Sequence, residues 1–369
     1  MSRHITRMFC AVAAGFALTA SGLATACAAS AARPSLSGRT AQSAIICCVS
    51  AVAATSARNA WAVGGGARTV ILHWNGTAWK RVPSPVYAYS TFLSSVAVIS
   101  AGDAWAVGYT SSPAGRDASL ILHWNGTTWK QVPSPNPSAG TVLDGVATTS
   151  AGDAWAVGFT GMGPRTCRRC TTLILHWNGT TWKRVPSPNP SVGSMLNGVA
   201  ATSAGNAWAV GSAPRLAGST LILRWNGKAW KRMPSPNPPG GTLTGVATTS
   251  ARSAWAVGFS QGGTLILHWT GTAWKRVPSP NPATSILEGV AAASARSAWA
   301  VGSTEGHTLI LHWTGTVWEQ VHSLNPTPDH GENLTGVAAT SARNAWVVGY
   351  AGGGGQVLIA HWNGVSWTT

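Results

Sequence analysis

The stretch HWNGTTWKRVPSPNP, residues 176–190, contains a histidine, two tryptophans, a lysine and an arginine within fifteen positions, as a binding or catalytic site would. Its two tryptophan rings could stack on a sugar or a nucleobase, and its lysine and arginine could bind an anion. His176 could ligate a metal or transfer a proton. Versions of this stretch recur six more times along the chain, so each chemical role has to be weighed against a structural one.

Tryptophan recurs with a regular period in three kinds of block. One tryptophan lies in an Ala-Trp-(Ala/Val)-Val-Gly block, a second in a block like Leu-His-Trp-Asn-Gly, and a third follows five residues later. The three sets stand at positions 61, 105, 155, 208, 255, 299 and 346, at 74, 124, 177, 225, 269, 313 and 362, and at 79, 129, 182, 230, 274, 318 and 367. They contain all 21 tryptophans, which indicates seven copies of one structural unit.

Each unit predicts four short strands, which in the fifth copy are residues 243–248, 254–258, 265–269 and 272–277. The third and fourth are joined by Asn-Gly in five copies and Thr-Gly in two, which predicts a hairpin with a type I′ turn. Ser-Pro-Asn-Pro then ends the unit, because proline cannot donate to a strand ladder. The pattern predicts an all-β, seven-bladed β-propeller with four antiparallel strands per blade. It spans residues 47–369, and blade seven closes on blade one without a large strand exchange.

The pairing of AWAVG with a Trp-Asn-Gly-x-x-Trp hairpin resembles the repeats of Asp-box (BNR) and YCF48-like propellers, and more loosely those of kelch and tectonin-type propellers. The resemblance covers nearly the whole chain after residue 46 and implies the propeller fold. The hairpin departs from an Asp box, since His176 and Asn178 replace its Ser/Thr and Asp, and Trp182 follows one residue too early. These families include glycosidases, lectins, assembly factors and scaffolds, so the resemblance implies no single activity.

Six of the seven copies have a histidine at one position, and the remaining copy, the fourth, has an arginine there. These residues are His73, His123, His176, His268, His312 and His361, with Arg224 in the fourth copy. A metal needs several ligands that converge, whereas these residues are spread one per blade around a ring. We therefore predict no metal site and interpret them as packed strand residues that bond a neighbouring blade.

The tryptophans are predicted to fill the space between blades, because residues i and i+2 of a strand share a face. The alternative is that the hairpin tryptophans, such as Trp79, Trp129 and Trp182, line grooves in which a sugar could stack.

A Lys-Arg pair follows the hairpin tryptophan in four copies. The pairs are Lys80-Arg81, Lys183-Arg184, Lys231-Arg232 and Lys275-Arg276. On the outer strand of a blade, such charges oppose edge-to-edge aggregation. The alternative is a basic rim that holds an anionic polymer.

The connection between the second and third strands is long only in copies two to four, at residues 109–119, 159–172 and 212–220. Because these blades are adjacent, their loops predict a cationic patch for an anionic or hydroxyl-rich ligand on one face of the ring. The residues of this patch are Arg116, Asp117, Arg165, Arg168, Arg169 and Arg215. Loop variation without a function is the competing interpretation.

Cys167 and Cys170 are predicted to form a disulfide, because the sequence has no second CxxC and no histidine at zinc-finger spacing. The pairing of Cys47 and Cys48 stays open.

The chain offers little for catalysis, with nine carboxylates in all. Asp103 and Asp153 fall at a turn between strands and are predicted to be turn formers. Asp144 and Glu288 lie near the start of first strands, three blades apart, so no close carboxylate pair follows. We predict a non-enzymatic protein without a cofactor, and a glycan-acting hydrolase of the Asp-box type is the alternative.

The N-terminus predicts export. Residues 1–26 read as a signal peptide, with a basic start, an apolar stretch and Ala-Thr-Ala before Cys27. Cys27 is also placed for lipid attachment, although the usual leucine stands one position early, at Leu23. Residues 27–46 are Ala/Ser/Arg-rich and predict a disordered lead-in. The mature chain has no predicted membrane span.

The formal net charge of +16 favours an anionic partner. Together these features predict a monomeric binding module, secreted or associated with the cell envelope. Its partner would be carbohydrate, an anionic cell-wall polymer or another protein, without specific nucleic-acid recognition.

Overall fold

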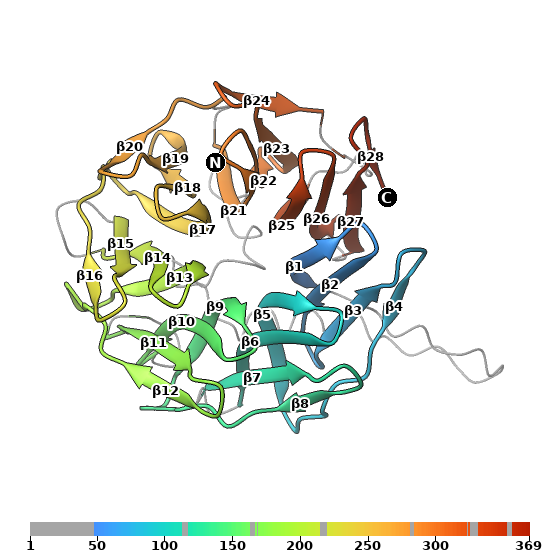
Figure 1. Ribbon diagram of the computed structural model, residues 1–369, viewed down its shortest axis with the longest axis vertical. Coiled ribbons are helices and arrows are strands. Elements are labelled where there is room, and N and C mark those ends of the chain that lie inside the picture. Colours follow the sequence, from blue (N-terminus) through green and yellow to red (C-terminus); the bar gives the residue numbers. More distant parts are fainter. Residues whose placement is uncertain are drawn as a thin grey trace, which may run out of the picture.

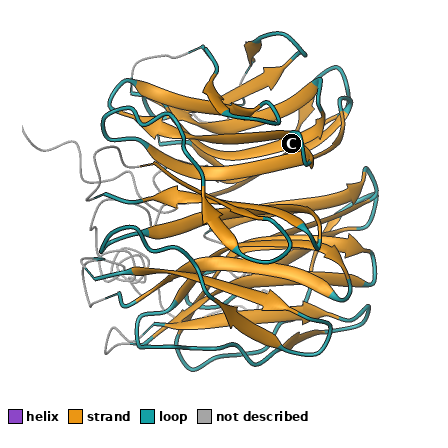
Figure 2. Cartoon of the chain, turned by 60° about the vertical axis from the view of Figure 1, so that its left-hand side comes forward, coloured by secondary structure: helices purple, strands orange, loops and turns teal. Residues whose placement is uncertain are grey.

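A computed structural model describes residues 48–112, 117–162, 167, 169–214, 220–280, 284–322, 324, 331–352 and 356–369. The predicted signal peptide and lead-in therefore lie outside the described residues. The described part forms 28 strands in seven four-stranded sheets arranged as a ring (Figure 1). Figure 2 shows the same strands from the side. None of the described segments forms a helix long and apolar enough to cross a membrane.

Each sheet consists of four consecutive antiparallel strands. Blade 1 contains β1 (Val49–Ser56), β2 (Asn59–Gly64), β3 (Val70–Trp74) and β4 (Trp79–Arg81), and blade 2 contains β5 (Ser90–Ser100), β6 (Asp103–Ser111), β7 (Ala118–Trp124) and β8 (Trp129–Gln131). Blade 3 contains β9 (Val142–Ser150), β10 (Asp153–Thr160), β11 (Thr171–Trp177) and β12 (Trp182–Val185), and blade 4 contains β13 (Met195–Ser203), β14 (Asn206–Ser212), β15 (Thr220–Trp225) and β16 (Trp230–Arg232).

The remaining blades repeat this order. Blade 5 contains β17 (Thr242–Ser250), β18 (Ser253–Ser260), β19 (Gly263–Trp269) and β20 (Trp274–Arg276). Blade 6 contains β21 (Ile286–Ser294), β22 (Ser297–Thr304), β23 (His307–Trp313) and β24 (Trp318–Val321). Blade 7 contains β25 (Asn333–Ser341), β26 (Asn344–Ala351), β27 (Gln356–Trp362) and β28 (Trp367–Thr368). The predicted seven-bladed propeller is confirmed.

The ring closes as predicted, blade 7 against blade 1, with no strand shared between their sheets. Trp346 of β26 and Val49 of β1 belong to one buried cluster, which Trp74 and Trp79 cover. The first strand of each blade lies innermost and the fourth outermost (Figure 1). Because consecutive strands alternate in direction, each blade has two ends. We call the end with the first-to-second and third-to-fourth strand turns the turn face, and the opposite end the loop face.

The third-to-fourth strand hairpin is confirmed, but the predicted type I′ turn is wrong. Trp177 pairs with Trp182, which leaves four residues in the loop, and only Gly179 among them has a positive φ, of 90°. The Asn178 side chain supports this loop, since its Oδ1 accepts hydrogen bonds from the N–H groups of Thr180 and Thr181 at 3.1 and 2.9 Å. Loops of the same length follow Trp269 and Trp313, where threonine replaces the asparagine. An asparagine that caps the loop in this way needs no left-handed backbone of its own.

The tryptophans fill the space between blades, as predicted. Trp155 of β10 is fully buried, and its ring centroid lies 4.9 Å from that of Trp225 and 5.1 Å from that of Trp230 in the next blade. The Trp230 contact is edge to face, at 87° between the ring planes, which is a favourable geometry for aromatic rings. The same triad recurs at each boundary between blades, including that between Trp346, Trp74 and Trp79.

Candidate functional site

The patch predicted on the long loops is only partly described. Arg116, Arg165, Arg168 and Arg215 lie outside the described residues. Arg169 is exposed on the loop face. Asp117 is buried, with 4% of its surface exposed, and its carbonyl oxygen accepts hydrogen bonds from the N–H groups of Gly140 and Thr141, both at 3.0 Å. Asp117 thus joins blade 2 to the entry of blade 3 rather than contributing a surface charge.

A disulfide links Cys167 to Cys170, with their Cα atoms 5.1 Å apart. Cys170 is buried and packs with Val142, Phe159 and Met195 at the boundary between blades 3 and 4. The bridge therefore holds the β10–β11 loop against the core.

The oxidised state of this pair can be tested chemically. Cys167 and Cys170 are expected to react with iodoacetamide only after reduction, because the disulfide leaves no thiol to alkylate. Peptide mass spectrometry of the purified protein, prepared without a reductant, measures this. Complete alkylation without a reductant would contradict the bridge.

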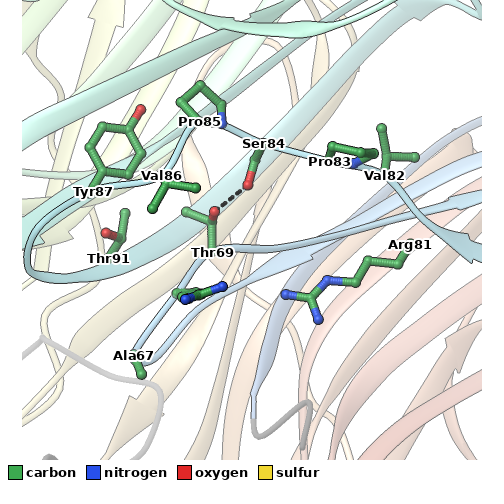
Figure 3. Close-up of a pocket in the computed structure, with 11 residues that line it drawn as sticks. Ala67, Thr69, Arg81, Val82, Pro83, Ser84, Pro85, Val86, Tyr87 and Thr91 are labelled. Atoms are coloured by element: carbon green, nitrogen blue, oxygen red, sulfur yellow. Dashed lines mark hydrogen bonds between the residues drawn. The ribbon is translucent and has the colours of Figure 1, made fainter. Parts of the chain in front are cut away.

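A pocket of about 140 Å³ lies on the loop face where blade 1 passes to blade 2. Its walls come from residues 67–69, at the entry to β3, and from the connection that follows Arg81 (Figure 3). Two cationic side chains, Arg68 and Arg81, line it, and Figure 3 shows Arg81 reaching toward the segment that carries Thr69. Thr91 closes one side and is fixed by paired backbone hydrogen bonds with Gly66 at 3.0 and 3.1 Å.

The pocket exists because the first connection between blades departs from Ser-Pro-Asn-Pro. In blade 2, the amide oxygen of Asn136 in that motif accepts a hydrogen bond from the N–H of Ser119 at 2.8 Å, which closes the connection onto β7. Blade 1 has Val86 at the corresponding position, and valine offers no side-chain acceptor. Val86 instead stands 78% exposed. The serine of the motif keeps its usual contact, a hydrogen bond between the hydroxyls of Ser84 and Thr69.

The electrostatics of the pocket favour an anion. No ion pair joins Arg68 or Arg81 to a carboxylate within the part of the chain that the structure describes. Tyr87, which replaces the second proline of the motif, packs its ring against the core cluster of blades 1 and 2. Its buried hydroxyl has no hydrogen-bond partner among the described residues, and burial raises its pKa to about 12. The tyrosine therefore stays neutral beside the two cations.

The repeated histidines are structural, but they bond within their own blade and not to a neighbour as predicted. His176 pairs across the strands with Trp155 and stacks on it at 4.2 Å between ring centroids. Its Nε2 lies 2.7 Å from Oδ1 of Asp153 in the same sheet. Asp153 therefore does more than form a turn, and Asp103 does the same for His123 at 2.9 Å. The two partners come together because β10 and β11 pair in register.

Arg224 replaces the histidine of blade 4 without loss of this role. Its guanidinium carbon lies 5.0 Å from the ring centroid of Trp208 and 5.4 Å from that of Trp269 in the next blade. The cation thus takes the place of a stacked imidazole ring.

The predicted alternative of sugar-binding grooves fails for most hairpin tryptophans. Five of them are 4–5% exposed, so their faces are covered by neighbouring blades: Trp129, Trp182, Trp230, Trp274 and Trp318. Trp79 and Trp367 are half-buried, and each still packs edge to face on a core tryptophan.

Asp144 and Glu288 lie on first strands, at the inner wall of the ring. Burial raises the pKa of each to about 8, and for Glu288 a hydrogen bond with Asn333 opposes part of this shift. Their strands, β9 and β21, are three blades apart, so they do not form a catalytic pair. Within the described segments, no three His, Cys, Asp or Glu side chains gather where they could hold a metal.

Comparison with known proteins shows the fold. No protein-family model matches the chain, and no curated protein matches its sequence. A solved structure of YCF48 bound to D1 peptide matches with a TM-score of 0.56 and 16% identity, over 86% of this chain and 92% of that one. YCF48 from Cyanidioschyzon merolae gives 0.55 and 16%, over 84% and 94%. The lectin of Aleuria aurantia, solved with α-methyl-L-fucoside, gives 0.51 and 10%, over 74% and 95%.

These matches place the chain among β-propellers whose solved members include a peptide-bound protein and a lectin. At such identities the likeness covers the fold and not the ligand. The pocket at Arg68 and Arg81 was missed in the sequence, although a signal was present. The sequence feature that indicates the pocket is the connection between blades 1 and 2, in which Val86 and Tyr87 replace the Asn-Pro of the motif.

Proposed function

We propose that the protein is an exported, non-enzymatic binding module that recognises an anionic group on a carbohydrate or cell-wall polymer. The pocket between blades 1 and 2 carries this proposal, because two guanidinium groups line it without an acidic partner among the described residues. Carboxylates and phosphates suit such a pair, since hydrogen bonds from arginine to an anion are both directional and strong. Export follows from the predicted signal peptide, and the +16 charge favours the same class of ligand.

The positions of the described acids support a binding role over a catalytic one. Of the described acids with raised pKa values, Asp144 and Glu288 lie in blades 3 and 6, and Asp117 lies in blade 2 but bonds to the entry of blade 3, so none of them lines the pocket. Among the described residues that line the pocket there is no carboxylate and no histidine to act as a catalytic base. Chromogenic glycosidase substrates are expected to stay intact with the purified protein, and turnover would favour the hydrolase alternative.

The pocket is tested with the double variant Arg68→Gln and Arg81→Gln. Binding of a glucuronate-containing disaccharide is expected to weaken at least about tenfold, because each charge-assisted hydrogen bond contributes roughly 1.5–3 kcal/mol. Isothermal titration calorimetry measures it, with the uncharged glucose analogue as the ligand control. The matched variant is Arg184→Gln, at the same position of blade 3, where Asn189 closes the connection.

Unchanged affinity in the double variant would refute the pocket. Equal weakening in Arg184→Gln would show that overall charge, and not the pocket, attracts the anion.

A further inference from the structure

The turn between the first and second strands carries an arginine in four blades and a glycine in three. The arginines are Arg252, Arg296, Arg343 and Arg58 of blades 5, 6, 7 and 1, and the glycines are Gly102, Gly152 and Gly205 of blades 2, 3 and 4. In the sequence Arg58 is far from the other three. Because blade 7 packs against blade 1, the closed ring makes the four arginines consecutive, and we call them the arginine arc.

Two turns position the backbone and the first side-chain carbons of each arginine in the arc. The N–H of Arg343 donates to the hydroxyl of Ser341 at 3.2 Å, and Arg58 makes the same bond with Ser56 at 3.1 Å. The side-chain stem then lies over the third-to-fourth strand turn of its own blade. A Cβ added to Gly364 would lie 3.0 Å from Cβ of Arg343. The arc therefore has a defined position on the turn face, although all four residues are exposed.

No carboxylate neutralises the arc. The guanidinium groups make no ion pair within the described segments. In blades 5, 6, 7 and 1, the first-to-second and the third-to-fourth strand turns contain no acid. Asp103 and Asp153 follow glycines on this face, in blades 2 and 3, and are bound to histidines. Glu319 of blade 6, an exposed acid on the outer strand β24, follows the hairpin tryptophan and lies opposite His312 in the sheet. Lys228, on the β15–β16 turn of blade 4, extends the positive side. The four arginines thus lie on turns that carry no acid, whereas the first-to-second strand turns of blades 2 and 3 lead into Asp103 and Asp153.

We propose that the arginine arc binds a linear polymer that carries a phosphate on each repeating unit. The arc supplies one cation per blade, so a small anion could contact only one of them, whereas a chain can contact several in succession. Each contact displaces counterions, and affinity therefore accumulates along the chain. This surface lies on the face opposite the pocket of Arg68 and Arg81 and does not depend on the function proposed for that pocket.

The test compares long-chain inorganic polyphosphate with tripolyphosphate, using the whole exported protein. Long chains are expected to bind much more tightly. The double variant Arg296→Gln and Arg343→Gln is expected to weaken long-chain binding about tenfold or more. It is also expected to reduce the slope of log affinity against log salt by about 1.4, at roughly 0.7 per lost contact. These residues are exposed, so unchanged tryptophan fluorescence will confirm that the variant is folded.

A matched variant removes the same charge elsewhere. Lys231→Gln with Arg232→Gln, on the outer strand β16, is expected to leave the affinity and the salt slope near their original values. Equal weakening in both variants would overturn the proposal, as would equal affinity for long and short chains. Loss of polyphosphate binding in Arg68→Gln/Arg81→Gln instead would place the polymer at the pocket. Binding of phosphatidylglycerol vesicles but not of polyphosphate would replace the polymer with a membrane surface.

Discussion

Replacing Gly258 by alanine is expected to lower the free energy of unfolding by about 3 kcal/mol or more. Gly258 ends the AWAVG block of blade 5 and pairs with Leu243, next to a bulge in β17. A Cβ at this position would lie 2.0 Å from the carbonyl oxygen of Thr242, and backbone cannot give way as a flexible side chain can. The same close approach recurs in every blade, which explains why each block ends in glycine.

Urea unfolding followed by tryptophan fluorescence measures this effect, since all 21 tryptophans belong to the blades. Gly152→Ala is the matched control, because a Cβ on Gly152 meets nothing within 4 Å. The control is expected to stay within about 0.5 kcal/mol of the original protein. If Gly258→Ala and Gly152→Ala lower the free energy of unfolding equally, the close backbone approach is not the reason for the glycine at position 258.

Asp144→Asn is expected to stabilise the protein at pH 7.5 and to leave it unchanged near pH 4. The pKa of Asp144 is about 8 in the folded protein, against an ordinary value of 3.8, so folding favours the protonated acid. Its contribution is fully present below pH 4 and is lost as the pH rises toward 8. The expected gain at pH 7.5 is of the order of a few kcal/mol, since one pKa unit corresponds to about 1.4 kcal/mol.

The packing around Asp144 supports the choice of asparagine. The corresponding residue of blade 4, Asn197, donates a hydrogen bond to the carbonyl oxygen of Leu243 in the next blade at 2.7 Å, and Thr335 makes the equivalent bond to Val49 at 3.1 Å. A carboxyl group can donate in this way only when protonated. The adjacent strands β5 and β13 carry no charged residue, and the nearest on β10, Asp153, stands at its far end.

Chemical denaturation at pH 4, 6 and 7.5 measures the pH dependence. Glu305→Gln removes an exposed carboxylate on the β22–β23 turn and is expected to change the profile little. A profile for Asp144→Asn that runs parallel to the original from pH 4 to 7.5 would contradict a protonated Asp144.

The ring and the residues that fill it could be predicted from the sequence because the signals are local. The Trp-Asn-Gly hairpin, the AWAVG strand and the proline connection each act within a few residues, and seven copies repeat the same information. The burial of Trp155 between blades followed from strand periodicity. The predicted turn type was wrong, because strand pairing stops at Trp177 and Trp182 and leaves four residues in the loop, where Asn178 caps N–H groups instead of adopting a left-handed backbone.

The candidate sites were less predictable, because each depends on neighbours that are distant in the chain. The bond between His176 and Asp153 depends on strand register across 23 residues. The pocket at Arg81 depends on a missing asparagine contact, which becomes visible only when Ser119 and Asn136 of the next blade are seen to bond.

The number of blades, the order of strands and the residues between blades follow from the repeats, because each repeat carries its own strand and turn chemistry. The residues that differ between copies are brought together only by the tertiary structure. Closure of the ring places Arg58 in the blade beside that of Arg343, and burial in the inner wall raises the pKa of Asp144 to about 8. Both effects arise from long-range packing, which local patterns do not encode.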